Sequence, residues 1–138
     1  MKKFFVPLLL AMALLLPTAI TEAAYVLVPN FRDITSNRIE ERIRFLGMDQ
    51  KSHNGVNYTR WNYECVDGKT SDYVNKYINK CKSQRDLQLV GQSSGNWYFV
   101  YTGGQAKFLT KINGEFHMHV RRSGDSVVVN LVGGMYPK

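Results

Sequence analysis

The C-terminal third of the chain, residues 87–134, reads LQLVGQSSGNWYFVYTGGQAKFLTKINGEFHMHVRRSGDSVVVNLVGG and decides the fold class. Strand-forming residues alternate there with short turn signals such as Gly103-Gly104 and Asn113-Gly114. These signals divide the stretch into the segments 87–92, 96–102, 105–111, 115–122 and 126–132. Because each connection is short, we expect sequential antiparallel pairing, a five-stranded meander over about residues 87–132.

Side-chain alternation predicts which face of this meander is buried. A three-residue loop around Asn113-Gly114 would set Lys111 opposite Glu115. Apolar residues of the last strands, Phe116, Met118 and Val120 among them, would then share one buried face. The other face would meet water and would carry a polar cluster, namely Lys107, Lys111, Glu115, His117, His119, Arg121 and Asn130.

The preceding half of the chain supplies elements that could cover the sheet. Apolar residues at helical spacing predict two helices, over about residues 35–46 and 71–83. Residues 25–28 and 58–65 suit two N-terminal strands, and the polar stretch 49–57 suits a loop. The sequence therefore predicts an α+β fold, with both helices on one face of the meander. How the two N-terminal strands join the sheet is left open.

Residues 1–23 have the layout of a secretory signal peptide. Lys2 and Lys3 precede an apolar run that is short for a membrane span, and small residues follow. We therefore expect residues 24–138 to form a single exported domain without a transmembrane span. The periplasm, the cell surface and the extracellular space all fit this expectation.

The chain contains two cysteines, Cys65 and Cys81. Alternation in the strand and the apolar stripe of the following helix both place them on core-facing sides. In an exported protein, two such residues are most simply a disulfide, so we expect Cys65 and Cys81 to be bonded.

The polar face of the meander holds the candidate functional residues. The formal net charge is +7, which favours an anionic polymer or a protein as partner. The leading interpretation is a non-enzymatic binding or envelope-associated module with a basic sheet face and no cofactor. Its expected binding residues are Lys107, Lys111, His117, His119, Arg121 and Asn130. The oligomeric state is left open.

The alternative interpretation is a small secreted hydrolase with a nuclease-like acid–base site. Its candidate catalytic residues are Glu115, His117 and His119, because residues two apart on a strand share a face. Two histidines and one carboxylate could also meet a metal, but the chain offers few further ligands, so we expect no metal site.

Overall fold

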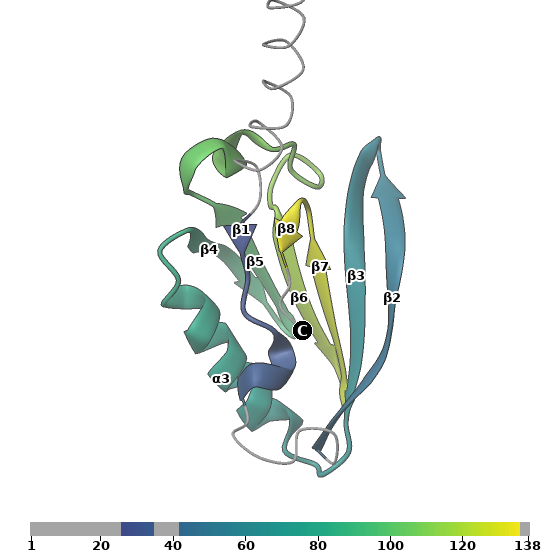
Figure 1. The fold of residues 1–138 in the computed structure, drawn as a ribbon. Helices are drawn as coiled ribbons and strands as arrows, with labels where there is room; N and C mark the ends of the chain where they lie inside the picture. The colour runs from purple at the N-terminus through teal and green to yellow at the C-terminus, as the bar shows by residue number, and fades with distance from the viewer. Residues whose placement is uncertain (1–25, 35–41, 136–138) are drawn as a thin grey trace, which may run out of the picture.

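The computed structural model describes residues 26–34 and 42–135, and these are mostly antiparallel sheet with one α-helix, which fits the broad α+β class (Figure 1). The main sheet contains the strands β2 (Ile43–His53), β3 (Val56–Cys65), β4 (Leu87–Ser93), β5 (Asn96–Tyr101), β6 (Met118–Ser123) and β7 (Ser126–Leu131). Their order across the sheet is β2-β3-β7-β6-β5-β4. The strands β4 to β7 are thus a meander, and the β2–β3 hairpin extends it by pairing β3 with β7.

One face of the sheet is covered by the helix α3 (Thr70–Lys82) and the 3-10 turn η1 (Phe31–Ile34) (Figure 1). The helix buries the apolar stripe that its sequence predicts, including Tyr73, Val74 and Tyr77. The hydroxyl of Tyr77 donates a hydrogen bond to the carbonyl oxygen of Pro29 at 2.7 Å, which ties the segment before η1 to the helix. This layer buries the core of the protein.

A second, two-stranded sheet joins the first and the last of the described residues. β1 (Val26–Leu27) pairs in parallel with β8 (Gly134–Met135). The short strand expected at residues 25–28 is therefore present, but it forms a separate ribbon and does not extend the main sheet.

The predicted meander has four strands and not five. The segment expected as its third strand, residues 105–111, lies instead in the 3-10 turn η2 (Gly104–Phe108) and the loop after it. Ala106 is buried while Phe108 is 73% exposed, so the segment has no continuous apolar face that a strand position would bury. β5 consequently pairs directly with β6.

The first predicted helix, over about residues 35–46, is wrong at its C-terminal end. Residue 42 is helical, but residues 43–46 already begin β2, and residues 35–41 lie outside the described residues. The polar stretch 49–57 is not a loop but the central part of a hairpin, with its turn at Asn54-Gly55, where both residues have positive φ. Almost every side chain of β2 is exposed, on both faces of the strand. The strand therefore lacks the alternation of buried and exposed residues that normally marks a strand in the sequence.

The predicted disulfide is also wrong, and with it the description of the protein as disulfide-stapled. Cys65 and Cys81 are both free, buried thiols. Cys65 lies close to Thr70 at the start of α3, but Cys81 lies eleven residues along that helix, about 16 Å at 1.5 Å per residue. A disulfide needs Cα atoms within about 7 Å. Burial raises the pKa of both thiols, that of Cys81 to about 12, so both are poor nucleophiles.

The predicted signal peptide, residues 1–23, lies outside the described residues, and export stays a prediction. Within residues 26–34 and 42–135, no helix has the length and apolar character needed to cross a membrane.

Candidate functional site

The face of the sheet opposite α3 is partly covered by the loop that precedes β6. Ile112 and Phe116 in this loop form an isolated bridge and pack with Val132 in a small second apolar cluster. Val56 and Tyr58 at the end of the β2–β3 hairpin pack against the same cluster. The loop therefore closes one end of an otherwise open sheet face.

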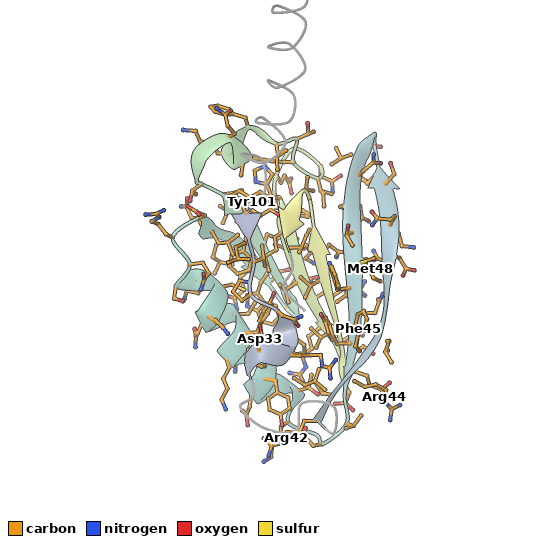
Figure 2. The ribbon with its side chains drawn as sticks, viewed as in Figure 1. Asp33, Arg42, Arg44, Phe45, Met48 and Tyr101 are labelled. Atoms are coloured by element: carbon orange, nitrogen blue, oxygen red, sulfur yellow. The ribbon has the colours of Figure 1, made fainter. Side chains whose placement is uncertain are left out.

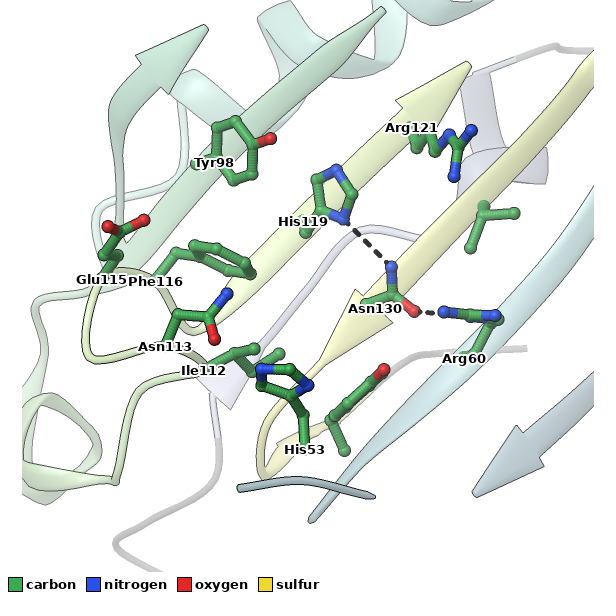
Figure 3. Close-up of a pocket in the computed structure, with 12 residues that line it drawn as sticks. His53, Arg60, Tyr98, Ile112, Asn113, Glu115, Phe116, His119, Arg121 and Asn130 are labelled. Carbon is green, nitrogen blue, oxygen red and sulfur yellow. Dashed lines mark hydrogen bonds between the residues drawn. The ribbon is translucent and has the colours of Figure 1, made fainter. Parts of the chain in front are cut away.

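A pocket of about 380 Å³ lies between this loop and the sheet (Figure 3). Strands β3, β5, β6 and β7 provide its floor, and the loop provides one wall. The pocket is lined by His53, Tyr58, Arg60, Tyr98, Ile112, Asn113, Glu115, Phe116, His119, Arg121, Val128 and Asn130. A volume of this size suits one small molecule.

A chain of hydrogen bonds crosses the floor of the pocket (Figure 3). Arg60 Nε donates to Asn130 Oδ1 at 3.0 Å, and Asn130 Nδ2 donates to His119 Nδ1 at 3.2 Å. His119 Nε2 then donates to Asn96 Oδ1 at 2.8 Å. Because Asn130 must accept from Arg60 and donate to His119, its amide has one orientation, and the imidazole is held as the Nε2–H tautomer.

His119 is uncharged at neutral pH. Burial, followed by the positive charges of Arg121 and Arg60, lowers the pKa of His119 to about 4. Both ring nitrogens are also occupied by hydrogen bonds. An imidazole in this state presents a flat, neutral ring to the pocket and is poorly suited to take up or release a proton near pH 7.

Aromatic rings line the side of the pocket next to the loop. Tyr98 stacks on His119 with ring centroids 4.8 Å apart and an interplanar angle of 6°. Phe116 lies 4.8 Å from Tyr98 and 5.7 Å from His119, tilted against both. These three rings give the pocket an aromatic wall beside its polar floor.

Two guanidinium groups give the pocket its charge. Arg60 is half-buried and uses its Nε for Asn130, and its two terminal nitrogens have no hydrogen-bond or ion-pair partner among the described residues. Arg121, on β6, is exposed and also lines the pocket. Glu115 is an exposed carboxylate in the loop (Figure 3). The pocket thus presents two cations and one anion, with both cations on strands of the floor.

His117 does not lie on the pocket face, although it is two residues from His119. It is fully buried on the α3 side, where its ring stacks on Tyr101 at 4.6 Å and 5°. Its Nδ1 accepts from the backbone N–H of Tyr101 at 2.9 Å, and its Nε2 donates to the carbonyl oxygen of Leu109 at 2.8 Å. Burial lowers the pKa of His117, so it is a neutral residue that holds the loop to the sheet.

The structure brings together four of the residues that the sequence singled out, namely Glu115, His119, Arg121 and Asn130. His117 is in the core, and neither Lys107 nor Lys111 lines the pocket. Lys107 lies in η2, with its Nζ 5.1 Å from the centre of the Phe108 ring. Glu115, His117 and His119 therefore do not converge as an acid–base group.

Sequence reasoning missed Arg60 and Tyr98 as site residues. It also placed Phe116 on the buried face with Met118 and Val120, which is wrong, because Phe116 packs in the second cluster and lines the pocket. Alternation along residues 58–65 does point Arg60 away from the core, which was the available signal. The pairing of β3 with β7 places Arg60 directly opposite Asn130, and that long-range register is not readable from the sequence.

The arrangement can recognise a flat ring and a negative charge together.

No three His, Cys, Asp or Glu side chains come together as a metal site within the described part of the chain. Comparisons with family models, with curated proteins and with solved structures found no match to this chain.

Proposed function

We propose that this protein binds a small organic anion that contains a flat ring, and that it does so in the pocket between β3, β5, β6, β7 and the loop at residues 112–116. The observation that carries the proposal is the half-buried guanidinium of Arg60. Its Nε is fixed by Asn130, while its terminal nitrogens have no partner among the described residues. Guanidinium groups bind carboxylates and phosphates through paired hydrogen bonds, and a positioned guanidinium loses little entropy on binding.

The aromatic wall supports a ligand with a ring. Tyr98, Phe116 and His119 lie within 6 Å of one another and beside the floor that holds Arg60. Stacking on such rings contributes about 1–3 kcal/mol for a flat base or similar ring. Because His119 stays neutral at pH 7, the second contribution to anion binding comes from Arg121.

The closed end of the pocket supports a single small molecule over a polymer. Ile112 and Phe116 block the sheet face at one end, so a long chain could not run through. This replaces the flat basic face expected from the sequence with a concave site.

The proposal is tested by calorimetric titration of the purified full chain with matched pairs of compounds. One pair is indole-3-acetate and indole-3-acetamide, and the other is adenosine 5′-monophosphate and adenosine. Acetate serves as an anion without a ring. We expect at least one ringed anion to bind, with its neutral partner and acetate weaker by about tenfold or more, because each lacks one of the two contacts.

Arg60→Gln is the decisive variant, and Lys51→Gln is its control. Lys51 is an exposed cation on β2 that is not part of the pocket lining. We expect Arg60→Gln to weaken the binding of the anion by about tenfold or more, and Lys51→Gln to leave its affinity unchanged. Equal binding of charged and neutral partners, or equal effects of the two variants, would contradict the proposal.

A further inference from the structure

The strand β2 forms an edge of the main sheet and is unusually long. It has 11 residues and pairs with β3 on one side, while the sheet order places no described strand on its other side. Strands in globular proteins average about 5–6 residues, and a long open edge presents a row of unpaired backbone groups. Such an edge is a template for pairing with another strand.

Exposed apolar side chains are concentrated on this edge. Phe45, Leu46 and Met48 are 42%, 53% and 50% exposed, although they lie within four consecutive residues. Phe45 and Met48 lie on the β2–β3 hairpin, to one side of α3 (Figure 2). The ring of Phe45 lies 5.5 Å from Tyr63 and 6.1 Å from Trp61, so the apolar surface continues onto β3.

A bulge in β2 gives this edge an unusual pattern of faces. The register with β3 shifts between Phe45 and Gly47, so Phe45 pairs with Tyr63 and Met48 pairs with Trp61. Since Tyr63 and Trp61 share a face, Phe45 and Met48 also share one, although three positions separate them. By the same reasoning Arg44, opposite Glu64, and Asp49, opposite Arg60, share the other face.

We propose that two copies of this chain associate through β2, antiparallel, about a two-fold axis between Leu46 and Gly47. In this register Phe45 of one copy lies opposite Met48 of the other, and Arg44 lies opposite Asp49. The bulge makes the faces match, because it puts both members of each pair on the same face. Each symmetric contact occurs twice, and the two sheets become one.

Charge complementarity and apolar burial together select this register. A second symmetric register, centred on Gln50, would also pair opposite charges, with Asp49 opposite Lys51. That register leaves Phe45 and Leu46 uncovered, since it uses only the strand beyond the bulge. The register centred between Leu46 and Gly47 covers all three exposed apolar residues and pairs the charges as well.

The test is sedimentation velocity of the purified full chain, with charge reversals on β2. We expect the unaltered chain to dimerise, and Arg44→Glu or Asp49→Arg to weaken the dimer by about tenfold or more, because each variant turns two attractive pairs into two repulsive ones. The double variant Arg44→Glu/Asp49→Arg should restore dimerisation. Lys51→Glu is the control and should not weaken the dimer, because this register sets Lys51 opposite Arg42 of the other copy and away from its Asp49.

The double variant separates contacts between copies from effects within one chain. Glu at position 44 faces Glu64, and Arg at position 49 faces Arg60, so the repulsion inside each chain persists in the double variant. Rescue can therefore come only from the pairing of two copies. A monomeric unaltered chain, single variants that dimerise normally, a double variant that fails to recover, or a Lys51→Glu variant as weak as Arg44→Glu would each overturn the proposal.

Discussion

The face of the sheet under α3 carries Phe99, Met118, Val120, Val127 and Val129, all fully buried, whereas the opposite face carries Arg60, His119 and Asn130 in a hydrogen-bonded row. The covered face depends on close packing of apolar groups, and it can be changed only at a cost in stability. The pocket face depends on a few oriented polar groups and one loop. The comparison teaches that stability and the proposed ligand binding depend on side chains that alternate along the same strands.

The largest effect on stability should come from a substitution on the covered face, Phe99→Ala. Phe99 is 0% exposed, so the substitution removes buried apolar surface and leaves a cavity. We expect the free energy of unfolding to fall by about 3–5 kcal/mol, measured by urea denaturation. Val100→Ala is the matched control, because the next residue of β5 points to the other face and is only half-buried. Equal losses in both variants would show that the two faces do not differ in this way.

A smaller effect should come from the pocket face, as a dependence of stability on pH. The pKa of His119 is about 4 in the folded chain and about 6.5 when the chain is unfolded. Between these values the unfolded chain binds more protons, so stability should be full above about pH 6.5 and should decline as the pH falls toward about 4.

The matched variant for this dependence is His119→Gln, which cannot titrate. His117 contributes in the same direction from the covered face, since its pKa is also lowered by burial. We therefore expect His119→Gln to reduce, and not abolish, the slope of unfolding free energy against pH. An unchanged slope in this variant would mean that His119 is not held neutral by the fold.

The smallest effect should be that of a reductant. Cys65 and Cys81 are separate buried thiols, so adding dithiothreitol should not shift the thermal unfolding midpoint. Alkylation by iodoacetamide should likewise be slow in the folded chain and rapid in urea, because burial raises the pKa of both thiols. A midpoint that drops on reduction would show that the covered face holds a disulfide after all.

The sequence predicted the elements in which one side is buried and the other is not. The stripe of α3 and the alternation in β3, with Tyr63 and Cys65 buried, are as expected. Met118 and Val120 are likewise on the covered face, and Asn130 lies on the opposite face with His119, as predicted. The prediction failed for β2 because the side chains of this strand are exposed on both faces. The prediction of a strand over residues 105–111 failed because a 3-10 turn has no two-residue repeat.

The position of His117 shows why the site was only partly predictable. The backbone N–H of His117 donates to the carbonyl oxygen of Phe99, while Met118 is the residue paired with Phe99 in the ladder. Two successive residues thus lie against one residue of β5, and both point into the core. Strict alternation gave the correct face for His119 and the wrong one for His117, because the irregularity falls between His117 and Met118.

The loop that walls the pocket is closed on itself by the bridge between Ile112 and Phe116. It meets the sheet chiefly through the packing of these two residues with Val132 and through the hydrogen bond between His117 and Leu109. None of the ladder hydrogen bonds of β3, β5, β6 and β7 runs through the turn at residues 113–115. Lengthening or shortening that turn would change the size of the pocket while the strands of the sheet kept their registers. Insertions and deletions at this one turn could thus adapt the same sheet to ligands of different sizes.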